Sequence, residues 1–524
     1  MKPTIASLSS LILLLIVLAT LGGQAGAQVE FPPTNTPRGT LAPSETPRAT
    51  VTATATPSPT ATLTPSPSAT FTPTQTTTPT ATATPTETQS GLPPTPTVFF
   101  PPEFTPQAQP TAIPTAMPRL RPRDAEGSPY EVINVLLIGH DSESIEQATG
   151  VFRTDTMIVV NVNLTTGTVS MLSLPRDLLV WISGWEMQRL NLAWGRGEAV
   201  GWTDGGWGLL RQTALYNFGL ELHYYAIIDF TGFRTLIDTL GGVEVAVDCP
   251  IRDYLFTGEY DQDDEPIFEL TTLPVGVHTL SGREALWYAR SRANSIEFDR
   301  GRRQQQILRA MWNQGRDLGL ITQLPELWSE VTAIVETNVP LEVMLELAPL
   351  ALSIEPNQIE NHFFRAGVET RPFTLPDGSN VQVPSPDNAM LALMVNFLTP
   401  PTENQVLADQ ARIEIYDASG AGRDYDRVAA DRLLWEGLLA QPMGELDEPQ
   451  AATSVIDFTG ATKGSSLEGL VRALNYNPNA VTFDPDPNRT TDFRVVLGEG
   501  FNTCVDRQIT DVEDAPPATP TPRP

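Results

Sequence analysis

Arginine side chains gather in one short stretch of an otherwise acidic chain. Residues 289–306, ARSRANSIEFDRGRRQQQ, hold five arginines and three glutamines, whereas the 524-residue chain has a formal net charge of −29. Like charges this close repel one another unless an anion lies between them. Guanidinium groups are planar, bidentate donors that suit phosphate or carboxylate. The stretch therefore predicts a binding site for a pyrophosphate, and the alternative interpretation is a solvated helix face.

The spacing of these residues indicates two segments that share the task. LSGREALWYA, residues 280–289, has helical spacing and leads into Arg290 and Arg292, which share one face if the chain there is extended. DRGRRQQQILRAMW, residues 299–312, has helical composition. Spacings of three and four place Arg300, Arg303 and Gln304 on one face of that helix. Four arginines and one amide donor are thus expected on neighbouring surfaces.

Carboxylates are expected to collect at one rim of a β-sheet. VINVLLIG forms a buried strand that ends at Gly139, with Asp141 just beyond it. Residues 154–177 predict two strands joined at TTG, a hairpin signal. Pairing around Thr166 places residues whose numbers sum to about 332 opposite one another. The rim then holds these four residues: Arg153, Asp155, Arg176 and Asp177.

Two interpretations of this rim are open. Surface ion pairs around a loop are common and contribute little. The functional interpretation is a hard cation such as Mg²⁺, held by Asp141 and Asp155 while water and phosphate oxygens supply the other ligands. The arginines would then hold those phosphates.

Composition limits the class of protein. The acidic chain would repel nucleic acid. Residues 1–27 combine an apolar run with an Ala-x-Ala pattern, which predicts either a cleaved signal peptide or a membrane anchor. Residues 28–127 are rich in Thr and Pro and predict a disordered stalk, and residues 513–524 form a similar tail. We therefore expect an extracytoplasmic protein, secreted to the envelope or anchored in the membrane.

The globular part is expected to contain two α/β domains, residues 128–400 and 401–512. The second domain alternates strands with helices and shows no catalytic constellation, so both a docking role and a purely structural role are open. Cys249 and Cys504 are the only cysteines. In an exported chain they either pair or remain free thiols.

The order of seven motifs resembles the catalytic domain of the LytR-CpsA-Psr family. The motifs are LLIGHD, RTDTMIVV, SLPRD, RLNLAW, LGGVEVAV, LSGREALWYARSR and EFDRGRRQQQ, and the resemblance covers roughly residues 130–400. It implies a central mixed β-sheet flanked by helices. The second domain resembles the LytR C-terminal domain, although Asp417 stands where that domain often has Asn.

The resemblance also implies roles for individual residues. Asp141 and Asp155 match the family's magnesium-associated aspartates. The pyrophosphate-binding positions are matched by Arg176, Arg290, Arg292, Arg300 and Gln304, and Arg153 and Arg303 also match recurrent motif positions of that site. Asp155, Arg176 and Arg290 are the expected catalytic residues. One departure is His140, which stands where the family commonly has a small hydroxyl residue.

The implied activity is transfer of a glycopolymer from a polyprenyl-pyrophosphate carrier onto peptidoglycan or protein. Mg²⁺ or another divalent cation is the expected cofactor. The membrane is an expected partner, reached through the N-terminal segment or the lipid substrate. Two alternatives are open: a non-catalytic envelope protein that binds polyprenyl-linked or wall polymers, and a regulatory attenuator. The apolar segments LLVWI and YYAIIDF could line a lipid tunnel, but an ordinary core explains both better.

Overall fold

The computed structural model describes residues 113–124, 126–140, 153–261, 266–292, 297–401, 411–461 and 466–504. These residues all fall within one unit of the chain, which includes residues 104–524. The predicted N-terminal segment, Asp141, most of the stalk and the tail lie outside the described residues. Within the described ranges, no helix combines the length and apolarity needed to cross a membrane.

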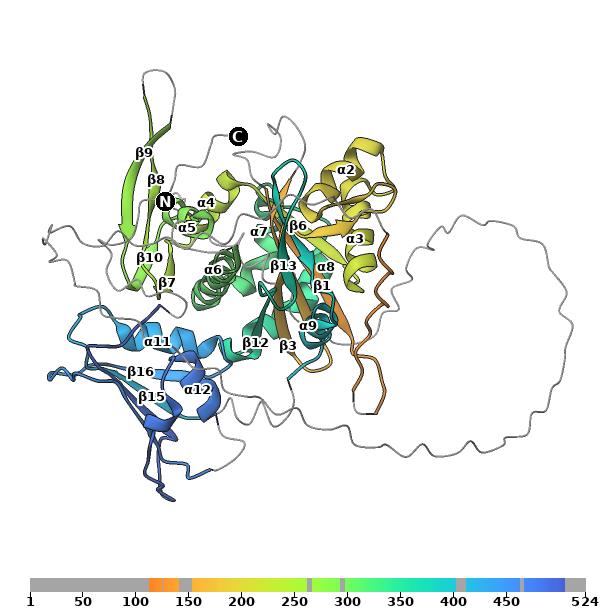
Figure 1. Cartoon of the computed structure of the whole chain (residues 1–524). Helices are drawn as coiled ribbons and strands as arrows, with labels where there is room; N and C mark the ends of the chain where they lie inside the picture. Colours follow the sequence, from red (N-terminus) through yellow and green to blue (C-terminus); the bar gives the residue numbers. More distant parts are fainter. Residues whose placement is uncertain are drawn as a thin grey trace, which may run out of the picture. The chain divides into compact units, whose positions relative to one another are not determined.

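A mixed six-stranded sheet lies at the centre of the first domain (Figure 1). Its strand order is β11-β6-β1-β2-β3-β12. In chain order its strands are β1 (Val132–His140), β2 (Thr154–Asn163), β3 (Thr168–Ser173), β6 (Tyr224–Ile228), β11 (Glu336–Thr337) and β12 (Ile359–Phe363). Strand β1 is antiparallel to β2 and parallel to β6, and β12 is parallel to β3. The predicted central mixed sheet is confirmed.

The hairpin of β2 and β3 has nearly the expected register. Ile158 lies opposite Ser173, and Asn163 lies opposite Thr168, within one residue of the predicted pairing. Because successive side chains of a strand point to opposite faces, this register decides which residues meet at the rim. It brings the start of β2 next to the segment that follows β3.

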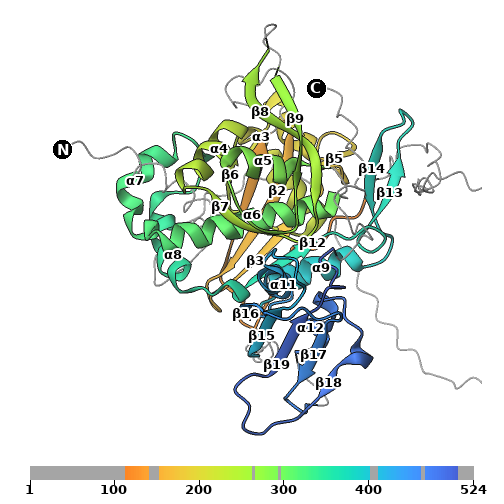
Figure 2. The same cartoon turned by 90° about the vertical axis from the view of Figure 1, so that its left-hand side faces the viewer.

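Alternating side chains of the central strands supply two separate cores. Val135 and Leu137 of β1 belong to one core. That core is covered by α4 (Phe230–Thr239), α5 (Gly282–Arg290), α6 (Glu297–Asp317), α7 (Leu324–Val331) and α8 (Leu341–Ser353). In Figure 2, α4, α5 and α6 lie in front of the sheet.

The opposite face of the sheet carries the second core. Leu136 and Ile138 point into it. Its helices are α2 (Ala193–Val200), α3 (Gly205–Phe218) and α9 (Ala389–Leu398). Residues of LLVWI and YYAIIDF belong to the buried cores, with Leu178, Val180, Ile182 and Ile227 in this one. The core interpretation of these two segments therefore fits better than a tunnel.

Shorter elements complete the first domain. The paired strands are β4 (Leu179–Trp181) with β5 (Met187–Arg189), β7 (Val243–Val247) with β10 (Gly276–Leu280), β8 (Ile251–Tyr260) with β9 (Pro266–Leu273), and β13 (Thr370–Thr374) with β14 (Asn380–Pro384). The 3₁₀ turns of this domain are η2 (Leu190–Leu192), η3 (Leu320–Gln323) and η4 (Pro356–Gln358).

The second domain is a small α/β unit with its own core. Its sheet has the order β16-β15-β19-β17-β18. The elements are β15 (Ile413–Asp417), α11 (Tyr425–Leu434), β16 (Ala440–Glu445), β17 (Ser454–Asp457), α12 (Leu467–Ala473), η5 (Pro478–Ala480), β18 (Thr482–Phe483) and β19 (Phe493–Leu497). A disulfide between Cys249 and Cys504, with Cα atoms 4.9 Å apart, links it to the first domain. Of the two alternatives for the cysteines, the structure has the pair.

Removal of this disulfide should lower stability substantially. The bond joins residues 255 positions apart, and a cross-link over so long a loop restricts the unfolded chain strongly. The variant Cys249→Ser/Cys504→Ser should lose about 3 to 5 kcal/mol of unfolding free energy, measured by urea denaturation. A reductant should destabilise the parent protein similarly and leave the variant unchanged. Equal stability of parent and variant would contradict the linkage.

His223 should make stability depend on pH. Its Nδ1 accepts a hydrogen bond from the Asn134 backbone N–H at 2.8 Å. Burial, with smaller contributions from Arg119 and Arg211, lowers the pKa of His223 from 6.5 to about 4. Between these values the unfolded chain binds a proton that the folded chain does not, so stability is full above pH 6.5 and falls towards pH 4.

The variant His223→Asn tests this because an amide oxygen can still accept the Asn134 bond. The parent should lose about 3 kcal/mol relative to the variant between pH 6.5 and pH 4. Urea denaturation across that pH range measures the difference in unfolding free energy between parent and variant. The pH-dependent contributions of the carboxylates are common to both proteins and cancel in this difference. A constant difference at every pH would refute this role of His223.

Candidate functional site

An ion-pair network occupies the rim where β2 begins and β3 ends. Arg176 Nη1 lies 3.0 Å from Asp155 Oδ1, and both side chains are about one-fifth exposed, at 19% and 18%. Arg176 Nε also donates to Asp177 Oδ2 at 3.2 Å. The hairpin prediction thus placed Asp155, Arg176 and Asp177 together correctly, and solvent still reaches the carboxylate of Asp155.

Two further residues join this network. Asn191 Nδ2 donates a long hydrogen bond, 3.5 Å, to Asp155 Oδ1. Arg189 Nε lies 3.5 Å from Asp177 Oδ1. Both come from RLNLAW, a motif that the sequence analysis noted without assigning any of its residues a role. The sequence signal that could have identified them is the alternation of polar Arg189 and Asn191 with apolar residues in this motif.

Helix α6 crosses the same rim and adds Arg300 to it. A Cβ at Gly301 would lie 3.2 Å from the Cβ of Ser173, so glycine allows α6 to approach β3 closely. Arg300 and Gln304 flank this contact and line a small cavity together with Asp155. Of the three residues predicted to share one helix face, Arg300 and Gln304 therefore lie together at the rim.

This cavity has a volume of about 30 Å³ and a mixed lining. Its polar side chains are Asp155, Thr156, Ser173, Arg300 and Gln304, and its apolar ones are Met157, Leu174, Pro175, Phe363 and Phe364. A volume this small holds about one or two water molecules, so the cavity marks the point where polar and apolar side chains meet at the rim and not the space for a whole ligand.

The three consecutive glutamines of α6 fix the helix to three places on the fold. Gln304 Nε2 donates to Thr156 Oγ1 at 3.1 Å, on β2. Gln305 Nε2 donates to Ser173 Oγ at 2.9 Å, on β3. Gln306 Nε2 donates to the Ala246 carbonyl at 2.7 Å, on β7. The sequence analysis assigned a role only to Gln304, because helical spacing placed it on the same face as Arg300 and Arg303.

Arg303 lies deeper than the other predicted arginines. It is 3% exposed. Its Nη2 donates to the Ser291 carbonyl at 2.5 Å, and its Nη1 donates to the Tyr288 carbonyl. Burial lowers the pKa of Arg303 to about 10, which still leaves it charged at neutral pH. These bonds fix the C-terminal end of α5, from which Arg290 extends.

Three of the predicted arginines, Arg153, Arg290 and Arg292, are exposed. Arg290 follows Ala289, whose carbonyl accepts a hydrogen bond from Gln304 at 3.3 Å. Its guanidinium carbon lies 4.1 Å from the centre of the Phe230 ring. Asp141 lies outside the described residues, directly after the last residue of β1.

His140 occupies a buried place at this rim, at the end of β1 opposite Thr154. Burial lowers the pKa of His140, and the carboxylates of Asp155 and Asp229 oppose that change in part. Because the lowered pKa lies below its usual 6.5, the imidazole is neutral at neutral pH. It therefore adds no positive charge to the rim.

Metal binding here would depend on few protein ligands. Among the residues that the structure describes, no group of three or more His, Cys, Asp or Glu side chains could hold a metal ion. Mg²⁺ needs less, because it usually keeps several waters and binds one or two carboxylates plus substrate phosphates. The partly exposed carboxylate of Asp155 fits such a ligand set.

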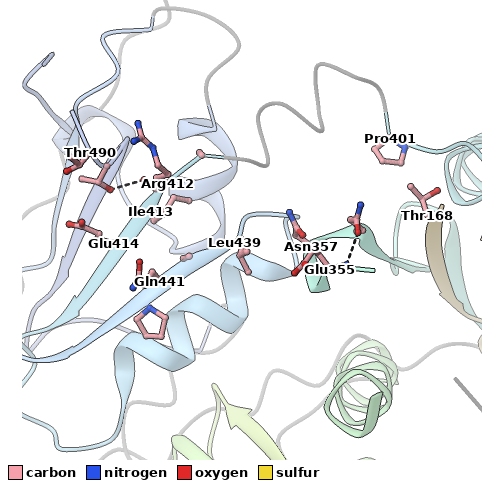
Figure 3. Close-up of a pocket in the computed structure, with 15 residues that line it drawn as sticks. Thr168, Glu355, Asn357, Pro401, Arg412, Ile413, Glu414, Leu439, Gln441 and Thr490 are labelled. Carbon is pink, nitrogen blue, oxygen red and sulfur yellow. Dashed lines mark hydrogen bonds between the residues drawn. The ribbon is translucent and has the colours of Figure 1, made fainter. Parts of the chain in front are cut away.

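A larger cavity of about 730 Å³ lies elsewhere (Figure 3). Arg412, Glu414 and Gln441 line it from the second domain, and Glu355 and Asn357 line it from the first. Thr168, at the start of β3, also contributes. Because the rim lies at the other end of β3, this cavity is separate from the ion-pair network.

Known proteins resemble a part of this chain. The chain is 32% identical over 238 residues to the polyisoprenyl-teichoic acid–peptidoglycan teichoic acid transferase TagU of Oceanobacillus iheyensis, covering 44% of this chain and 68% of that protein. It is 30% identical over 211 residues to the regulatory protein MsrR of Staphylococcus aureus, covering 40% and 57%. The crystal structure of B. subtilis TagV matches at 23% identity, covers 52% of this chain and 99% of that chain, and has a TM-score of 0.41.

The family model gives the same assignment. The model of the LytR_cpsA_psr family matches residues 111–384, which span the sheet, the rim and α6 but not the second domain. The resemblance found in the seven motifs is therefore confirmed. Since the match covers more than half of the chain, this protein belongs to the LytR_cpsA_psr family.

Proposed function

We propose that this protein transfers a glycopolymer from a polyprenyl-pyrophosphate carrier onto peptidoglycan or protein during assembly of the cell envelope. The main observation in support is that Asp155, Arg300 and Gln304 line one cavity together with apolar side chains. A polyprenyl pyrophosphate has the matching chemistry, a doubly charged phosphate group attached to an apolar chain. The name of the relative TagU, a polyisoprenyl-teichoic acid–peptidoglycan teichoic acid transferase, agrees with this proposal.

The proposed reaction is a phosphoryl transfer. A hydroxyl oxygen of the acceptor bonds to the sugar-side phosphorus, and the bond between that phosphorus and the bridging oxygen breaks. Polyprenyl monophosphate leaves with the bond's electron pair. The hydroxyl proton passes to a rim carboxylate, Asp155 or Asp177, and then to solvent. Catalysis of this kind depends mainly on positioning and on neutralisation of charge.

The arginines of the rim would perform that neutralisation. Arg176, already held by Asp155, stabilises charge on the transferred phosphate, and Arg290 extends to it from the end of α5. Arg300 and Gln304 bind the carrier from α6, while Arg153 and Arg292 add donors at the exposed edge. Arg303 contributes chiefly by fixing the end of α5.

A divalent cation, Mg²⁺ by preference, is proposed as the cofactor. Asp155, together with Asp141, would hold it. When bound, the ion would neutralise phosphate charge that the arginines alone leave uncompensated.

The proposed location is outside the cytoplasm, with the chain secreted or anchored in the membrane through residues 1–27. The disulfide between Cys249 and Cys504 supports export, since disulfides persist mainly in oxidising compartments. The lipid part of the carrier would bring the catalytic domain to the membrane surface.

A transfer assay tests the proposal. Purified protein is incubated with Mg²⁺, a polyprenyl-pyrophosphate sugar and peptidoglycan fragments, and products are identified by mass spectrometry. Polyprenyl monophosphate should be released while a sugar phosphate is added to the acceptor. Arg290→Ala and Asp155→Ala should each lower the rate about 100-fold or more, because each removes a group that stabilises the transition state.

Arg371→Ala, at an exposed position of β13, is the matched control and should keep the parent rate. Chelation of the cation should abolish transfer, and Mg²⁺ should restore it. If the protein binds the carrier but turns over none of several sugar donors, the transferase proposal would be wrong, and a non-catalytic binding protein would be the better interpretation.

Replacement of Arg303 should affect folding more than replacement of its exposed neighbours. Arg303→Met leaves the carbonyls of Tyr288 and Ser291 buried without these donors, which costs about 1 to 3 kcal/mol for each unsatisfied group. Arg292→Gln, at an exposed position, should change the unfolding free energy by less than about 0.5 kcal/mol. Urea denaturation of both variants measures the contrast. Equal effects would show that Arg303 does not fix α5.

A further inference from the structure

The far face of α6 is held by the second domain. Arg309 of α6 is 3% exposed, and its Nη2 lies 3.1 Å from Asp431 Oδ1 of α11. Burial lowers the pKa of this guanidinium, and the carboxylate of Asp431 opposes that shift. A buried cation without its counter-ion is costly, so Asp431 stabilises α6 where it lies.

Asp431 binds a second side chain of the same helix. Gln306 Nε2 donates to Asp431 Oδ2 at 2.9 Å. The other end of this amide, Gln306 Oε1, accepts a hydrogen bond from the Tyr288 hydroxyl at 2.8 Å. Tyr288 belongs to α5, the helix that leads to Arg290. One carboxylate of the second domain thus contacts α6 directly and α5 through a single amide.

Trp435, at the C-terminal cap of α11, extends this contact to the cavity. Its Nε1 donates to Asp431 Oδ2 at 3.2 Å. Its ring lies 4.2 Å from the guanidinium carbon of Arg309. The same ring lies 5.9 Å from the ring of Phe363, and Phe363 lines the cavity with Arg300 and Gln304. The second domain therefore supports a wall of the site that its own residues do not line.

We propose that Asp431 and Trp435 are positioning residues for the transfer site, which they support through α6 and Phe363. Gln306 and Arg309 lie on the α6 face that meets α11, whereas Arg300 and Gln304 lie on the face that meets the cavity. Because a helix rotates as one body, a contact that fixes one face also fixes the direction of the other. This inference rests on the proposed function, since it assigns the second domain a part in binding the carrier.

The test compares variants within one interface. Asp431→Asn removes the charge opposite Arg309, and Asp431→Glu restores it. Trp435→Leu removes the ring and keeps every charge. Arg427→Gln is the matched control, because Arg427 also lies on α11 and pairs with Glu244 of β7 in the first domain, but does not involve α6. The disulfide remains in all four variants.

Binding and turnover are measured separately on the full chain. Calorimetry with geranylgeranyl pyrophosphate and Mg²⁺ reports binding of a polyprenyl pyrophosphate, and the transfer assay reports KM and kcat. Asp431→Asn should weaken binding about tenfold and raise KM with little change in kcat, as expected when ground-state and transition-state contacts are lost together. Trp435→Leu should weaken binding about threefold. Asp431→Glu should recover most of the affinity, and Arg427→Gln should equal the parent.

Thermal unfolding of each variant separates this role from a general loss of folding. If Asp431→Asn does not fold, Trp435→Leu decides the question alone, because it leaves no buried charge uncompensated. Parent-like binding and KM in the folded variants would overturn the inference while the transferase stands. Absence of binding and turnover in the parent protein would instead overturn the proposed function. An equal loss in Arg427→Gln would show that the whole interface matters rather than the contact with α6, and would also overturn the inference.

Discussion

The fold around the rim depends on the accommodation of one highly polar helix inside the protein. Helix α6 places several arginines and glutamines below or close to one-tenth exposure, including Arg300, Arg303 and Arg309. Buried polar groups are tolerated only when they find partners. Each of the three consecutive glutamines, Gln304 to Gln306, binds a different strand, and Arg303 binds the end of α5. The helix is therefore fixed in rotation and in depth by polar contacts as well as by its apolar residues.

This accommodation favours arginine over lysine at the buried cationic positions of α6. Burial lowers the pKa of Arg303 to about 10, so its charge persists at neutral pH. A lysine, whose ordinary pKa is about 10.4, would have its pKa lowered by the same burial towards neutral pH, so its charge would be less secure. It would also offer one compact ammonium in place of a planar fork that can bind two carbonyls at once. Arginine thus serves both the buried and the phosphate-binding positions of one helix.

Sequence reasoning succeeded where a short-range rule fixes geometry. The period of two in a strand and the TTG turn placed Asp155 near Arg176, and helical spacing placed Arg300 and Gln304 on one face. It missed Asn191 and Arg189 because they approach the rim from a separate segment. It also missed the partners of Gln305, Gln306 and Arg309, since β3, β7 and α11 meet α6 only in the folded chain. The pairing of Cys249 with Cys504 was left open for the same reason. The roles of Asp141 and of the exposed arginines remain predictions.

The position of α6 between the central sheet and the second domain links that domain to the site. On one side the helix packs against the sheet, whose register is set by hairpins and apolar alternation. On the other side its polar residues meet Asp431 and Trp435, which stand outside the segment matched by the family model. Because the polar side chains of α6 have partners on both sides, loss of the partners on one side should shift the position of the helix. The second domain can therefore affect binding at the rim through the counter-ion that it supplies to a buried arginine.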